Sequence, residues 1–240
     1  IRDVNMAYSE HARRYLVDCG LPKERTYVTG SPMAEVLHNN LAEIEASDVH
    51  QRLGLEKGKY ILLSAHREEN IDTEKNFLSL FTAINKMAEK YDMPILYSCH
   101  PRSRNRLAAS GFKLDPRVIQ NEPLGFHDYN CLQMNAFAVV SDSGTLPEES
   151  SFFTSVGHPF PAICIRTSTE RPEAIDKGDF IIAGIDEKSL LQAVETAVGL
   201  CQNGQYGIPV PDYADENVST KVVKIIQSYV GIVNKMVWRK

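Results

Sequence analysis

The feature that most constrains the fold is a repeated alternation of short apolar runs with longer segments of helical periodicity. A short, continuous apolar run is typical of a strand buried on both faces of a sheet. Strands that alternate with helices along a chain indicate a parallel sheet covered by helices. We therefore predict an α/β fold with a parallel sheet flanked by helices. The predicted strands are residues 60–64, 94–98, 117–120, 136–140 and 162–165.

Capping residues mark where the helices between these strands begin and end. Asp72 or Thr73 can cap one helix, and Asp186 can cap another that Asn203-Gly204 should end. The segment 218–237 carries Val and Ile on more than one face. It is therefore predicted to be either a well-buried helix or a helix that packs across two domains.

Composition excludes several classes of protein. Hydrophobic residues at 43% and charged residues at 24% are typical of an ordinary globular chain. A net charge of −5 without a basic tract argues against a nucleic acid partner. No signal peptide and no apolar run of about 20 residues is visible, so we expect no membrane partner and a cytoplasmic location. The five cysteines lack metal or redox spacing, which predicts free thiols.

Polar residues follow four of the predicted strands. They are His66, His100, Ser143 and the segment around Glu170. Ligands of open α/β sheets bind beyond the carboxyl ends of the strands. The sequence therefore predicts a ligand site at this edge of the sheet.

A Ser-Gly turn gives that site its chemistry. An apolar strand runs into Ser143 and Gly144, which open a helix, so backbone N–H groups and the positive helix end point beyond the strand and favour phosphate. One turn later, Glu149 is placed to accept hydrogen bonds from a ribose. Ser143 could also be an ordinary N-cap, and we interpret Glu148 as an acid that complements the helix dipole. Together these residues predict a site for a nucleoside diphosphate.

Three motifs in the same order carry a family resemblance. They are residues 64–70 (SAHREEN), 142–149 (DSGTLPEE) and 169–173 (TERPE). In this order they resemble the non-hydrolysing UDP-N-acetylglucosamine 2-epimerases. Residues 5–16 and 28–32 also resemble the middle of such enzymes, so the resemblance covers nearly the whole chain.

The resemblance implies a division of the chain into parts. The family has two Rossmann-like domains in a glycosyltransferase-B-like architecture, and this chain is similar to the C-terminal portion. We expect a fragment that lacks the N-terminal catalytic acids. Residues 1–40 are expected to be the end of the first domain and a linker, 41–215 the UDP-binding domain, and 216–240 a helix that packs toward the first domain.

The resemblance also implies an activity. Such an enzyme is a UDP-N-acetylhexosamine 2-epimerase, which inverts sugar C2 by elimination and re-addition of UDP, for surface polysaccharide precursors. This chain would be the UDP-binding half, inactive alone, with a UDP-sugar as substrate and a homodimer as the full-length enzyme. No cofactor is implied, and the histidines show no metal-ligand spacing.

Each site residue has an implied role and an alternative. The resemblance implies that His66 is catalytic and that UDP is bound by Ser143, Gly144, Glu149 and Arg171. A strand-end histidine could instead bond a neighbouring carbonyl, and Arg171 could form a salt bridge with Glu170 or Glu173. A second nucleotide-sugar site is implied for Arg67 and His100, although the arginines after His100 could form a solvated helix face.

Two departures from the family pattern concern the sugar. Thr145 stands where the family has a second Gly, and Pro147 stands where it has Gln. Proline in a first helical turn is compatible with a helix start. The departures suggest a subgroup, which includes relatives acting on 6-deoxy-N-acetylhexosamine nucleotides in capsule and O-antigen pathways, so the UDP-sugar stays open. Two other functions stay open as well, a glycosyltransferase of the same architecture and a non-catalytic nucleotide-sugar-binding module.

Overall fold

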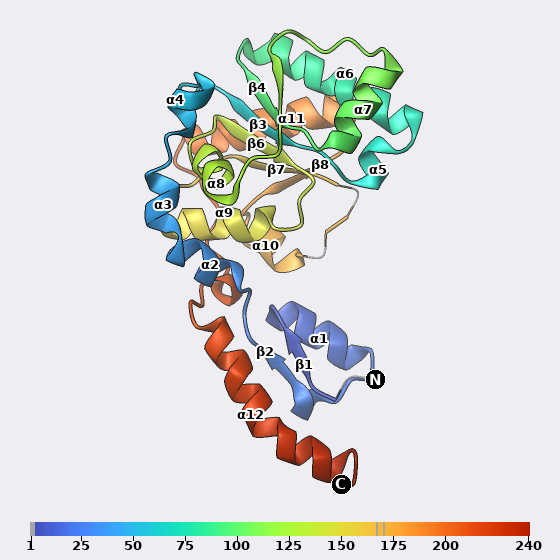
Figure 1. Ribbon diagram of the computed structural model, residues 1–240, viewed down its shortest axis with the longest axis vertical. Helices are drawn as coiled ribbons and strands as arrows, with labels where there is room; N and C mark the ends of the chain where they lie inside the picture. The colour runs from blue at the N-terminus through green and yellow to red at the C-terminus, as the bar shows by residue number, and fades with distance from the viewer. Residues whose placement is uncertain (1–2, 167, 170) are drawn as a thin grey trace.

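The computed structural model describes residues 3–166, 168–169 and 171–240. Its main body is a six-stranded parallel sheet with the strand order β5-β4-β3-β6-β7-β8 (Figure 1). The α/β prediction is confirmed, and all five predicted runs form strands. The strands are β3 (Ile61–Ser64), β4 (Ile95–Ser98), β5 (Val118–Asn121), β6 (Ala138–Ser141), β7 (Ala162–Ile165) and β8 (Ile181–Ala183).

Helices cover both faces of the sheet because alternate strand residues face opposite sides. On one face, Ile61 and Leu63 pack with residues of α6, α7 and α11, and on the other Leu62 packs with residues of α2–α4 and α8–α10. The first group is α6 (Glu74–Tyr91), α7 (Pro101–Ser110) and α11 (Glu187–Gln202), and α5 (Glu68–Ile71) precedes it. The second is α2 (Met33–Asn39), α3 (Leu41–Glu45), α4 (Val49–Leu53), α8 (Phe126–Met134), α9 (Leu146–Ser155) and α10 (Pro172–Asp176).

The capping predictions are confirmed. The Thr73 side chain accepts a hydrogen bond from the Asn76 N–H at 3.2 Å, and Asp186 accepts one from the Ser189 N–H at 3.0 Å. The helix α11 ends at Gln202, with Asn203 at its C-cap. Local chemistry therefore fixes these helix ends.

The strand order places a reversal at the centre of the sheet. From β3 the chain moves outward through β4 to β5, and it then returns so that β6 pairs with the other side of β3. In the register between these strands, Ser64 lies opposite Ser141. Such a reversal opens a crevice beyond the strand carboxyl ends, where open α/β sheets bind ligands.

A smaller unit lies apart from the main sheet. It contains β1 (Asn5–Ala7), α1 (Glu10–Asp18), a 3₁₀ turn (Lys23–Arg25) and β2 (Thr26–Val28), with β1 and β2 parallel. Strands of three residues are too short to give a periodic signal, and β1, β2 and β8 were not predicted.

The long helix α12 (Val218–Met236) runs beside this smaller unit (Figure 1). The Tyr229 hydroxyl donates to the Glu24 carbonyl oxygen at 2.9 Å, and the rings of Tyr27 and Tyr229 are 5.6 Å apart. The prediction of a well-buried helix is wrong, because Val218 is the single buried residue of α12. Its apolar residues are instead largely exposed. They include Val223, Ile226, Val230, Ile232 and Met236.

Three further features concern the part of the chain that the structure describes. No helix there combines the length and apolarity needed to cross a membrane. No group of three or more His, Cys, Asp or Glu side chains there could hold a metal ion. All five cysteines are free thiols, as predicted.

Candidate functional site

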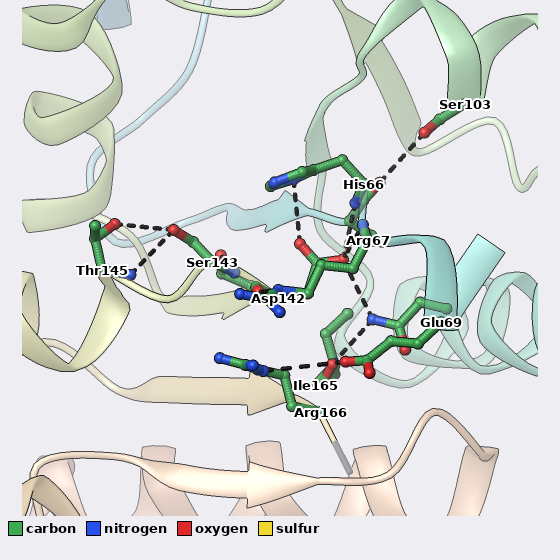
Figure 2. A network of polar contacts seen from close by, with 12 residues as sticks. His66, Arg67, Glu69, Ser103, Asp142, Ser143, Thr145, Ile165 and Arg166 are labelled. Atoms are coloured by element: carbon green, nitrogen blue, oxygen red, sulfur yellow. Dashed lines mark hydrogen bonds and ion pairs between the residues drawn. The ribbon is translucent and has the colours of Figure 1, made fainter. Parts of the chain in front are cut away.

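Asp142 fixes the geometry at the centre of the site. It directly follows β6, and its side chain is fully buried. Its Oδ2 accepts hydrogen bonds from the backbone N–H groups of His66 and Arg67, each at 2.8 Å, and from Asn70 Nδ2 at 3.2 Å (Figure 2). A buried carboxylate with three donors is well compensated. The segment after β3 is therefore fastened to the end of β6.

His66 projects from this fastened segment and is half-exposed. Its Nδ1 lies 3.1 Å from Asp142 Oδ1, so its neighbour is a carboxylate rather than a carbonyl. Contact with a buried carboxylate on one side of the ring restricts how the imidazole can turn. The predicted histidine is thus held in one orientation at the strand edge.

Gly144 lies between two guanidinium groups. A Cβ atom at Gly144 would be 3.5 Å from Arg67 Nη2 and 4.0 Å from Arg166 Nη1. The Arg67 Nε donates to the Asp142 carbonyl oxygen at 2.7 Å, and Arg166 Nε lies 4.0 Å from Glu69 Oε1. Guanidinium groups suit phosphate because of their permanent charge and planar donors. The absence of a side chain at Gly144 keeps the space next to both groups free of a methyl group.

Arg166 was not among the predicted site residues. It is buried and directly follows β7, so the rule that selected His66, a polar residue just past an apolar run, would also have found it. Figure 2 shows Arg166, His66 and the turn at Ser143, which come from the ends of three neighbouring strands and lie around one region. The neighbouring residues Thr167 and Glu170 lie outside the described part of the chain.

The turn after Asp142 leads into α9 as predicted, with one difference. The N-cap residue is Thr145, so the interpretation of Ser143 as an ordinary N-cap is wrong. The Ser143 Oγ instead accepts the Thr145 N–H at 3.3 Å. Pro147 lies in the first helical turn, where its missing N–H costs nothing. The positive end of α9 therefore faces the two guanidinium groups beside Gly144.

Glu149 is buried, and both of its carboxylate oxygens accept hydrogen bonds. Oε1 accepts from the Thr145 hydroxyl at 2.7 Å, and Oε2 accepts from Gln133 Nε2 at 2.8 Å. Burial raises the pKa of Glu149, while the bonds from Gln133 and Thr145 act in the opposite direction. Gln133 was not predicted as a site residue, because it lies within α8 rather than at the end of a strand.

Glu148 lies in the first turn of α9, where the sequence placed it as an acid that complements the helix dipole, and its side chain is buried. Its Oε2 accepts from the Ser31 hydroxyl at 2.7 Å, and its Oε1 accepts from Arg171 Nε at 2.9 Å and Nη2 at 2.8 Å. The Arg171 guanidinium also lies over the Tyr8 ring, 5.1 Å from its centre. Glu148 therefore joins α9 to the connection that leads from the smaller unit to α2 and, through Arg171, to Tyr8 of the smaller unit.

Arg171 was predicted either to bind UDP or to pair with Glu170 or Glu173. Its described pairing is with Glu148, and Glu170 lies outside the described residues. Glu173 instead accepts a hydrogen bond from the Tyr213 hydroxyl at 2.6 Å. A contact between Arg171 and a diphosphate stays a prediction, and Arg166 lies nearer to Gly144.

No contact between Arg67 and His100, the two residues of the predicted second nucleotide-sugar site, is found among the described residues. Arg67 belongs to the cluster around Gly144, whereas His100 Nδ1 accepts the Arg102 N–H at 3.3 Å and caps α7. Arg102 itself forms surface ion pairs with Glu68 and Asp72. This second site stays a prediction.

Comparison with known proteins identifies the family. The sequence profile described as UDP-N-acetylglucosamine 2-epimerase matches residues 1–227. The chain belongs to the UDP-N-acetylglucosamine 2-epimerase family. The resemblance carried by the three motifs is thus confirmed.

Individual members of this epimerase family agree in sequence and in fold. The UDP-N-acetylglucosamine 2-epimerase of Methanococcus maripaludis is 29% identical over 94% of this chain and 61% of its own length. The solved epimerase structure from Rickettsia bellii is 38% identical, with a TM-score of 0.89 over 100% of this chain and 63% of that one. The Methanocaldococcus jannaschii enzyme, solved in complex with UDP-GlcNAc and UDP, is 26% identical with a TM-score of 0.82 over 94% of this chain and 61% of that one. This chain thus spans about three fifths of the length of these epimerases.

Proposed function

We propose that this chain forms the UDP-binding part of a UDP-N-acetylhexosamine 2-epimerase. The observation that carries the proposal is the pair of guanidinium groups, from Arg67 and Arg166, beside the empty side-chain position of Gly144 at the start of α9. Two permanent positive charges and a helix N-terminus form a seat for a diphosphate. Family membership supports uridine as the nucleoside.

Different residues around this seat would bind different parts of the substrate. The diphosphate would lie against Gly144, Arg67, Arg166 and the turn at Ser143. Glu149 would accept hydrogen bonds from the ribose hydroxyls, as a buried carboxylate near a phosphate site does in other nucleotide folds. His66, oriented by Asp142, would donate a hydrogen bond or a proton to the UDP that leaves.

The reaction would remove the proton at sugar C2, release UDP and add UDP again after reprotonation on the opposite face. Such a route requires an enzyme that grips UDP while the unsaturated sugar is present. We assign that grip to this chain, which we expect to be inactive alone. We further propose a cytoplasmic enzyme that is a homodimer at full length and supplies precursors for surface polysaccharides, with the particular UDP-sugar set by the pocket near Thr145.

Calorimetric titration with UDP tests the proposal, with CMP and ADP as controls. We expect selective UDP binding that weakens about tenfold or more in Gly144→Ala, since the added methyl group would fill the seat without a clash in the free protein. Glu149→Ala should weaken binding by a similar factor. The exposed first-turn acid of α11 supplies a matched control, and Glu187→Ala should leave binding unchanged.

Two outcomes would contradict the proposal. One is a folded sample that does not bind UDP, and the other is equal binding of UDP and ADP. If UDP is bound, the full-length protein should convert its UDP-sugar to the C2 epimer without an acceptor. A product that requires an acceptor would instead identify a glycosyltransferase.

A further inference from the structure

We propose that Gln133 and Thr145 are positioning residues that hold the Glu149 carboxylate in register with the two hydroxyl groups of a ribose. This inference rests on the proposed function, because it takes Glu149 as the ribose ligand. The inference adds Gln133 and Thr145 to the proposed site. Their side chains need not touch the nucleotide, because they would act by orienting the Glu149 carboxylate.

The two hydrogen bonds to Glu149 are evenly shared between its oxygens. Thr145 donates to Oε1 at 2.7 Å, and Gln133 donates to Oε2 at 2.8 Å. An ionised carboxylate oxygen has two lone pairs, so each oxygen keeps one for a further donor. Two oxygens with one free lone pair each match a vicinal diol, which offers two O–H donors side by side.

The orientation of the Gln133 side chain is set by its hydrogen bond to Glu149. The side chain is fully buried, and only the NH₂ end of an amide can face a carboxylate, which fixes the direction of the group. A buried amide is costly unless it is hydrogen-bonded. Gln133 lies on α8, so its bond to Glu149 on α9 also holds the two helices in one arrangement.

Thr145 links the carboxylate to the phosphate turn. It is the N-cap residue of α9, but its hydroxyl makes no cap and instead reaches Glu149 one helical turn ahead. The Ser143 hydroxyl lies 2.8 Å from the Thr145 hydroxyl. Because Thr145 donates its proton to Glu149, Ser143 donates to Thr145. The relay from Ser143 to Glu149 ties the diphosphate seat to the ribose contact.

Titrations with UDP and 2′-deoxy-UDP test the inference. Gln133→Met keeps the length of the side chain and Thr145→Val keeps its shape, while each removes one donor to Glu149. We expect each variant to lose about tenfold in affinity for UDP and much less for 2′-deoxy-UDP, so that ribose selectivity falls. The rise of UDP affinity with pH should also be displaced to higher pH in both variants than in the wild type, because a carboxylate with fewer donors keeps its proton to higher pH.

Thr145→Ser restores the hydroxyl and should restore both the selectivity and the pH profile. Thermal unfolding of each variant checks that the fold is intact, and Thr145 is the more exposed of the two sites. An equal loss for the two nucleotides, or no loss, would overturn the inference. If Glu149→Ala weakens UDP binding while Gln133→Met and Thr145→Val match the wild type, only the positioning role fails. If the wild type does not prefer UDP to 2′-deoxy-UDP, the ribose assignment fails as well.

Discussion

Two buried aspartates, Asp142 and Asp179, have carboxyl groups in very different environments. Asp142 is surrounded by three nitrogen donors, whereas burial dominates at Asp179 and raises its pKa to about 7, with Ser151 acting in the opposite direction. A carboxyl group that binds its proton more tightly in the folded state stabilises that state in acid. Asp179 should therefore make the protein less stable as pH rises toward neutrality.

Asp179→Asn tests this at the scale of one residue. The folded pKa of about 7 exceeds the unfolded value near 3.9, so the contribution is complete below about pH 4 and is lost as pH rises to 7. Urea unfolding of the wild type should show a fall of about 2–4 kcal/mol across this range that the variant lacks. The exposed Asp18→Asn should keep the wild-type profile. A wild-type difference from Asp179→Asn that does not change with pH would contradict the assignment.

The same scale explains why the site was only partly predictable. The turn at Ser143 and the strand-end His66 follow from local patterns, and the structure places both at the strand edge. The partners of Glu148 and Glu149 could not be predicted, since they include Ser31 and Gln133, which are distant in sequence. A neighbour supplied by another element leaves no trace in a local pattern.

Among the elements, the four-residue strands of the sheet were predictable and the segment after α11 was not. Residues 205–213 carry few apolar neighbours of regular spacing, yet Val210 and Tyr213 are buried. The Val210 N–H donates to the Ser151 hydroxyl at 2.7 Å, and the Ile208 N–H donates to the Lys177 carbonyl oxygen at 2.9 Å. Long-range hydrogen bonds, rather than periodicity, hold this segment on the main body.

A glycine in that segment gives a prediction at the scale of elements. A Cβ atom at Gly207 would lie 2.6 Å from the Gly178 carbonyl oxygen and 2.7 Å from the Asp179 Cα, both parts of the backbone. Gly207→Ala should therefore lower the free energy of unfolding by about 1–3 kcal/mol, measured by urea unfolding.

Gly199→Ala is the matched control for that substitution. Gly199 lies within α11, and a Cβ atom there would meet nothing within 4 Å. Alanine is the better helix former, so this variant should gain about 0.5–1 kcal/mol. Equal effects of the two substitutions would show that the close approach at Gly207 is not what limits the segment.

At the scale of the whole molecule, α12 presents an apolar surface to solvent. Ile226 and Val230 are each more than half exposed, on a helix that runs along the smaller unit (Figure 1). Exposed apolar patches on a folded chain favour association. The chain taken alone should therefore self-associate through α12.

Sedimentation velocity over a range of concentrations measures this association. The double variant Ile226→Ser, Val230→Ser should weaken it by about tenfold or more, since each buried aliphatic side chain contributes about 1.5–3 kcal/mol. Gln227→Ala, on an exposed polar position between them, should leave it unchanged. A wild-type chain that stays monomeric at high concentration would contradict the prediction.

The pairing of Glu148 with Arg171 and Ser31 has a consequence for how the molecule can move. Glu148 fastens α9 to the connection that leads from the smaller unit to α2, and the next residue, Glu149, belongs to the proposed nucleotide site. One helical turn carries both carboxylates, so neither can shift without straining the bonds of the other. In mechanical terms, the joint between the two units and the proposed nucleotide site are a single part.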